Sequence, residues 1–123
     1  MAPPKHKLAR EHLELALADI DDEDERGAIN ALFYAAEAAV VALAEAHGID
    51  TQKHHGLKAD AAKKLHGDGL IDNDYGPLLR ALNQTRKDVW YEGEEPDFGE
   101  RSLADVAAEV DSLVEQAEAQ CGD

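Results

Sequence analysis

Apolar residues recur at helical spacing along much of the chain, and the pattern is strongest over residues 28–47. At about 100° per residue, seven apolar side chains share one broad arc. They are Ile29, Leu32, Phe33, Ala36, Ala39, Val40 and Leu43. Asn30, Tyr34 and Glu37 form a narrow polar stripe beside that arc, and Gly48 follows where a left-handed cap ends many helices. We therefore expect residues 28–47 to form a buried central helix. Because Glu37 lies at its middle, we expect no membrane span.

The segment before this helix predicts a first helix and an acidic turn. Pro3 and Pro4 suit the opening of a helix that runs to about Ile20. Its expected apolar stripe comprises Leu8, Leu13, Leu15, Leu17 and Ile20. The acidic residues between 19 and 25 suit a solvated turn, since carboxylates favour the N-terminal end of the next helix. Their spacing lacks the central glycine of a calcium-binding loop.

Three more helices are predicted after Gly48. A short one ends at Gly67 and Gly69. Another covers residues 75–91, with Pro77 in its first turn and a cap from Asp72, Asn73 or Asp74. The last begins at a capping box made by Ser102 and Asp105 and frays near Gln120. Its apolar stripe contains Leu103, Val106, Val110, Leu113 and Val114.

Composition limits the fold to one class. The chain has 123 residues, of which 5% are aromatic, and strand-like alternation is absent. We expect a single domain over residues 1–123, with residues 1–4 and 121–123 frayed. The expected fold is all-α, an antiparallel up-and-down helical bundle of four to five helices.

Charge and cysteine content bear on partners and location. The net charge of −15 repels nucleic acid at long range but allows a local basic site. The first 18 residues contain charges and no apolar run, and Cys121 is the single cysteine. We therefore expect a cytoplasmic protein.

Residues 53–66 are locally basic. Lys53, Lys58, Lys63 and Lys64, together with His54, His55 and His66, face one acid in that segment, Asp60. The lysines are candidate phosphate contacts, or they balance acids on other helices. No two of these histidines have the i, i+4 spacing of a metal site, so we expect neither a metal nor a cofactor.

Arg86 lies on the apolar face of its helix. That face otherwise contains Leu79, Leu82, Val89 and Trp90. An arginine directed toward a core needs a partner, or it must line a cleft or extend its stem to water. The sequence offers Glu37 and Tyr34 as partners, and we expect Arg86 to pair with Glu37 in a cleft that also contains Tyr34 and Tyr91.

Several short segments together resemble the HEPN domain family. Asn30-Ala31-Leu32-Phe33-Tyr34-Ala35 is similar to its Ser/Asn-x-x-Tyr-Tyr-Ala pattern, and Lys53-His54-His55-Gly56 after Gly48 is similar to its Thr-His-Ser-Gly stretch. Arg86 followed by Tyr91 resembles its Arg-x4-6-His motif. The resemblance implies a bundle that forms a homodimer, with the arginine clefts of two protomers close together.

The resemblance also implies what the protein does. Catalytic members are metal-independent ribonucleases, but Tyr91 stands here where their histidine would, and a phenol is a poor general base at neutral pH. The expected function is a noncatalytic nucleotide- or RNA-binding module, which could be the partner of a nucleotidyltransferase-like protein in a toxin–antitoxin system. The expected ligand-binding residues are Arg86, Tyr91, Asn30, Tyr34, Glu37 and His54. Two alternatives remain: a ribonuclease toxin using Arg86 and Tyr91, and a purely structural bundle.

Overall fold

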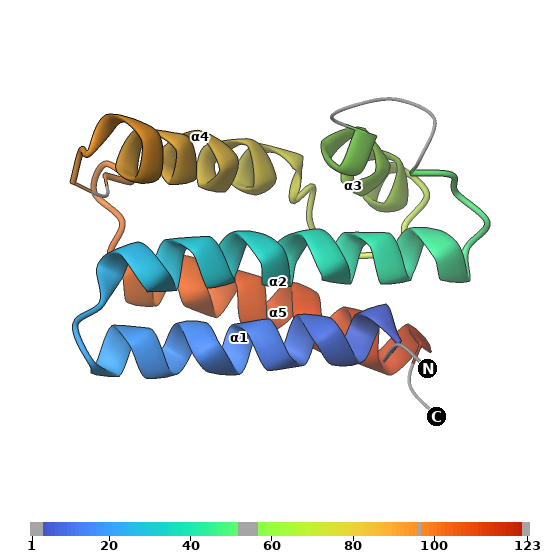
Figure 1. The fold of residues 1–123 in the computed structure, drawn as a ribbon. Helices are drawn as coiled ribbons and strands as arrows, with labels where there is room; N and C mark the ends of the chain where they lie inside the picture. The colour runs from blue at the N-terminus through green and yellow to red at the C-terminus, as the bar shows by residue number, and fades with distance from the viewer. Residues whose placement is uncertain (1–3, 52–56, 96, 122–123) are drawn as a thin grey trace.

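The computed structural model describes residues 4–51, 57–95 and 97–121, which form five helices and no strand. The helices are α1 (Lys5–Asp21), α2 (Glu25–Ala46), α3 (Leu57–Gly67), α4 (Gly76–Glu92) and α5 (Leu103–Cys121). Helix α2 contacts each of the other four. Helices α3 and α4 cover one side of α2, and α1 and α5 cover the other (Figure 1). The predicted all-α class and the central place of residues 28–47 are confirmed.

The core is built around the apolar arc of α2. Six of the seven predicted arc residues are buried, and the seventh, Phe33, is half-buried. Full burial of side chains such as Leu32 and Leu43 contributes about 1.5–3 kcal/mol each. By length and composition α2 could also cross a membrane, but a buried core helix meets the same criterion, and 67% of its apolar window is buried in the bundle.

Local signals in the sequence fix several helix ends. Asp24 caps α2, where its Oδ1 accepts a hydrogen bond from the backbone N–H of Gly27 at 3.0 Å. Gly48 has φ of +72° after the end of α2, as a left-handed cap requires. The predicted capping box is confirmed: the N–H groups of Ser102 and Asp105 each donate to the other residue's side chain at 3.1 Å.

Two predicted features of α1 and α4 differ in the structure. Leu15 and Leu17 are 57% and 44% exposed, whereas Ala9, Leu13 and Ala16 make the buried face of α1. Small side chains on this face let α1 approach both α2 and α5, so two of the leucines point outward. Trp90 is likewise exposed at the edge of α4, where its Nε1 donates to a backbone carbonyl of α2.

The chain ends and the start of α4 also differ from expectation. Pro4 is the N-cap residue of α1, and Cys121 is the last residue of α5 rather than frayed, since its thiol donates to the carbonyl of Ala42. The N-cap position of α4 is Tyr75, and Asp74 instead accepts from the N–H of Gly76 at 2.8 Å. Residues 1–3 and 122–123 lie outside the described residues.

Candidate functional site

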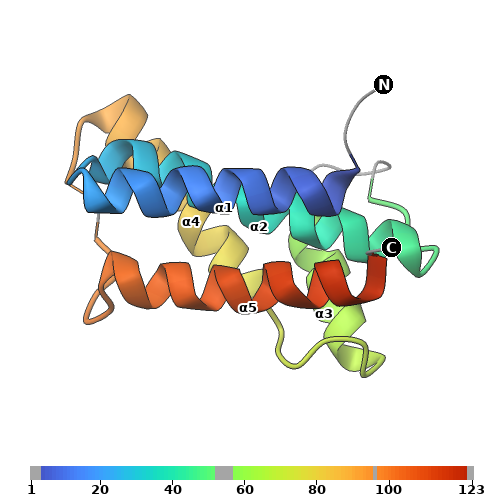
Figure 2. The ribbon, with the colours of Figure 1, turned by 90° about the horizontal axis from the view of Figure 1, so that it is seen from below.

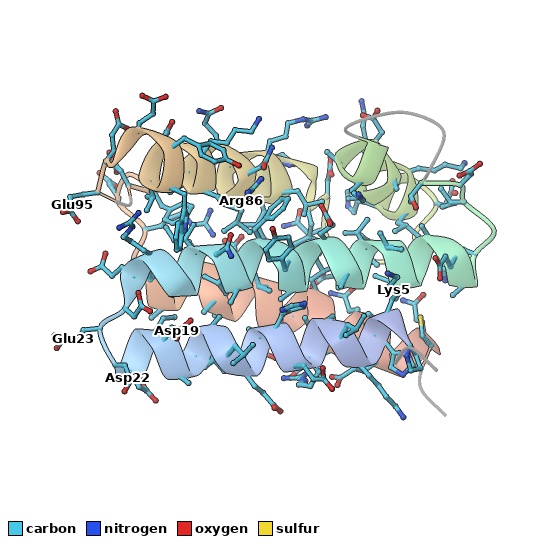
Figure 3. The ribbon with its side chains drawn as sticks, in the orientation of Figure 1. Lys5, Asp19, Asp22, Glu23, Arg86 and Glu95 are labelled. Carbon is cyan, nitrogen blue, oxygen red and sulfur yellow. The ribbon has the colours of Figure 1, made fainter. Side chains whose placement is uncertain are left out.

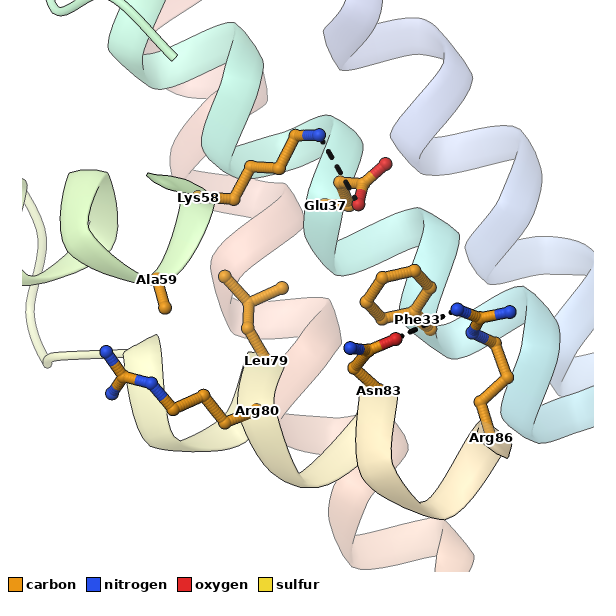
Figure 4. Close-up of a pocket in the computed structure, with 8 residues that line it drawn as sticks. All are labelled: Phe33, Glu37, Lys58, Ala59, Leu79, Arg80, Asn83 and Arg86. Atoms are coloured by element: carbon orange, nitrogen blue, oxygen red, sulfur yellow. Dashed lines mark hydrogen bonds and ion pairs between the residues drawn. The ribbon is translucent and has the colours of Figure 1, made fainter. Parts of the chain in front are cut away.

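A pocket of about 310 Å³ lies where α2, α3 and α4 meet (Figure 4). It is lined by Phe33, Glu37, Lys58, Ala59, Leu79, Arg80, Asn83 and Arg86. Helical spacing explains how these residues gather: Phe33 and Glu37 are one turn apart on α2, as are Asn83 and Arg86 on α4. The first turn of α3 adds Lys58, so the pocket depends on three helices that are separate in sequence.

Arg86 is half-buried at one end of this pocket, between α4 and α2 (Figure 3). Its Nη2 donates to Oδ1 of Asn83 at 2.9 Å, and its Cζ lies 4.8 Å from the centre of the Phe33 ring and 6.0 Å from that of Tyr34. The guanidinium is therefore held by an amide and an aromatic face. Its Nε is buried without a hydrogen-bond partner among the described residues, so the hydrogen-bonding capacity of the group is incompletely used.

Glu37 pairs with Lys58 instead of with Arg86. Nζ of Lys58 lies 3.7 Å from Oε2 of Glu37, and both side chains are partly exposed. The expected ion pair between Arg86 and Glu37 is wrong, because the rotation of α4 directs Arg86 onto Phe33 while the start of α3 brings Lys58 to the carboxylate. A partly exposed pair of this kind contributes at most about 1 kcal/mol, so an incoming anion could compete with Glu37 for Lys58.

Arg80 supplies a third cation. It is exposed, and its Nη2 lies 3.5 Å from Oδ1 of Asp60, near the limit of a hydrogen bond. Figure 4 shows Arg80 and Arg86 on opposite sides of Leu79 and Asn83. The lining of the pocket thus holds three cationic side chains and one carboxylate, although the whole chain has a net charge of −15.

The structure brings together part of the predicted site. Glu37, Lys58 and Arg86 line one pocket, while Tyr34 stands beside it, with its ring centre 5.4 Å from that of Phe33 and 5.7 Å from that of His12. Tyr34 therefore touches the site through Phe33 without lining it.

Other predicted residues lie elsewhere. Asn30 is half-buried, Tyr91 is 71% exposed, and neither lines the pocket. Lys63 is exposed and does not line the pocket. Nζ of Lys64 lies 3.3 Å from Oδ2 of Asp68, which directly follows α3. Lys53, His54, His55 and Gly56 lie outside the described residues.

Sequence reasoning missed Phe33, Asn83 and Arg80 as site residues. Phe33 belongs to the predicted core arc. The signal for Asn83 in the sequence is its position one helical turn before Arg86. Nothing in the sequence marked Arg80, since its role depends on where α3 packs against α4.

Within residues 4–51, 57–95 and 97–121, no three His, Cys, Asp or Glu side chains are grouped to hold a metal ion. In a comparison with protein families, the family model of the HEPN domain matches residues 6–119. No curated protein and no solved structure matches the chain.

Proposed function

Since the chain belongs to the HEPN domain family, we propose that it is a noncatalytic module that binds phosphate groups of a nucleotide or of RNA between α2, α3 and α4. One observation carries this proposal. Lys58, Arg80 and Arg86 line one pocket together with a single carboxylate, Glu37, although the chain as a whole is strongly acidic.

The arrangement suits phosphate in three respects. Arg86 offers a planar fork of donors held in place by Asn83 and Phe33, and such forks bind phosphate oxygens in pairs. Lys58 adds a point charge, and its ion pair with Glu37 is weak. The separation of Arg80 from Arg86 favours a ligand with more than one phosphate, and the half-buried ring of Phe33 offers apolar surface to a base or ribose.

Binding can be measured by fluorescence polarisation with a labelled single-stranded RNA of about 12 nucleotides, with ATP and inorganic phosphate as competitors. Arg86→Gln and Lys58→Gln should each weaken binding about tenfold or more, as expected for loss of a charge-assisted contact. Lys63→Gln is the matched control, because Lys63 is an exposed lysine of the same helix outside the pocket, and it should change affinity by less than about twofold.

The salt dependence gives a second measure. Each lost phosphate contact should lower the slope of log affinity against log salt by about 0.7 for single-stranded RNA. Equal effects of Lys58→Gln and Lys63→Gln would mean that general charge, and not the pocket, attracts RNA. Competition by ATP at concentrations where phosphate has no effect would identify a nucleotide ligand.

The same reactions should be examined on a denaturing gel. We propose that the RNA stays intact, since Tyr91 is exposed and outside the pocket that holds Arg86. Cleavage without added metal that disappears in Arg86→Gln would replace this proposal with the ribonuclease alternative.

Assembly is a separate part of the proposal and rests on the family. We propose a homodimer, for which light scattering at micromolar concentration should give about twice the chain mass of 13.3 kDa. A nucleotidyltransferase-like protein is the proposed partner, and co-expression followed by co-purification tests it.

A further inference from the structure

A groove on the face opposite the pocket has no role in the proposed function. It lies between α1 and α5, which run antiparallel along that face (Figure 2), and its volume is about 470 Å³. Leu17 and Ile20 of α1 form one wall, and Ala104, Ala107 and Ala108 of α5 form the other. The methyl groups of α5 are too small to fill the space between the helices, so Leu17 remains 44% exposed.

The margins of this groove are acidic. Asp21 and Asp111 are part of its lining. Arg10 is the nearby cation, but it is already engaged, since it donates to Asp111 at 3.2 Å and to Glu118 at 3.0 Å. The margin therefore carries more negative than positive charge.

The negative charge continues past the end of α1. Asp19, Asp22 and Glu23 lie together at this end of the bundle (Figure 3). Burial, and then the neighbouring carboxylates Asp24 and Asp22, raise the pKa of Asp19 above its usual value, as expected in a region of excess negative charge.

From the exposed leucine, the empty space and the acidic margins, we infer that this groove binds an amphipathic, basic helix of a partner protein. The apolar side of that helix would cover Leu17 and Ile20, and its lysine or arginine side chains would face Asp21 and Asp111. An apolar groove between two helices can receive the apolar side of a third helix.

Charge argues against a second copy of this chain, and against nucleic acid, as the occupant of the groove. A second copy related by a two-fold axis would bring Asp21 and Asp111 of both chains together, which is repulsive. If the basic helix α3 of a second copy occupied the groove instead, the two chains would associate head to tail. Repeated head-to-tail contacts form open chains of molecules. Nucleic acid would be repelled by the same carboxylates.

The test uses the full-length protein and a labelled synthetic helix of about 14 residues, roughly four turns, with leucine on one side and lysine on the other. Ala108→Lys places a bulky cation in the groove at an exposed position. It should weaken binding about tenfold, as expected for loss of a central contact. Ala81→Lys is the matched control, because Ala81 is an exposed alanine of α4 on the opposite side of α2, and it should change affinity by less than about twofold.

A second peptide, in which serine replaces every leucine, keeps the charge and removes the apolar side. It should bind at least about tenfold more weakly than the first. Equal weakening by Ala108→Lys and Ala81→Lys, equal binding of both peptides, or no binding at low salt would overturn the proposal.

Light scattering of the protein alone completes the test. A mass that halves in Ala108→Lys would show that a second copy occupies the groove, which contradicts the proposal. Arg86→Gln should leave peptide binding unchanged, because Arg86 lies on the other side of α2, so this proposal and the proposed phosphate site fail separately.

Discussion

The contact between the Arg86 guanidinium and the Phe33 ring can be measured by a double-mutant cycle. Arg86→Met keeps an unbranched stem of similar length and removes the charge, and Phe33→Leu removes the ring. The single variants also lose other contacts, such as the hydrogen bond from Arg86 to Asn83. Those losses cancel in the coupling free energy between residues 33 and 86, because each occurs equally whether or not the other residue is substituted.

The geometry sets the expected size of the coupling. Cζ of Arg86 lies 4.8 Å from the Phe33 ring centre, well within the about 6 Å range of a cation–π contact. Such contacts contribute about 0.5–1 kcal/mol when exposed and about 2 kcal/mol when desolvated, and Arg86 is half-buried. We therefore expect a coupling of about 1 kcal/mol.

Urea unfolding followed by circular dichroism gives the free energy of unfolding for each variant, with the fluorescence of Trp90 as a second probe. Tyr34→Leu is the control cycle, since the Tyr34 ring centre lies 6.0 Å from Cζ of Arg86, at the limit of the range. Its coupling should stay below about 0.3 kcal/mol, the usual error of additivity. A coupling below about 0.3 kcal/mol between Arg86 and Phe33 would refute the described position of Arg86. A coupling between Arg86 and Tyr34 as large as that between Arg86 and Phe33 would refute it as well.

Further predictions concern stability. Burial, and then the carboxylate of Asp24, raise the pKa of Asp19 in the folded state, so Asp19→Asn should increase the urea midpoint at neutral pH. This gain should disappear as the pH falls below about 3.9, where the unfolded chain is also protonated, and a loss of stability at neutral pH would contradict it. Gly76→Ala should lower the melting temperature by an amount equivalent to about 1–3 kcal/mol, since its Cβ would lie 2.9 Å from the backbone oxygen of Ala59. Gly67→Ala, whose Cβ would meet nothing within 4 Å, should instead stabilise by about 0.4–1 kcal/mol, and equal effects of the two substitutions would refute the close packing of α3 on α4.

Features that depend on neighbours in sequence were predictable. The apolar arc of α2 is long and uninterrupted, so its side chains are buried only if other helices pack around α2. The capping box of Ser102 and Asp105 needed only residues three apart. The resemblance to the HEPN family rested on short segments in order, and the family match agrees with it.

Tertiary structure alone decided which side chains meet. The sequence placed Arg86 on an apolar face, but whether it meets Glu37 or Phe33 depends on how α4 is rotated and shifted against α2. The same holds for Lys58, which reaches Glu37 only because the start of α3 packs against α2. In α1 the leucine pattern suggested one buried face, yet close packing against two helices selected the face with alanines. The spacing of apolar residues defines the faces of a single helix, whereas the angle and distance between helices arise from the packing of both surfaces together.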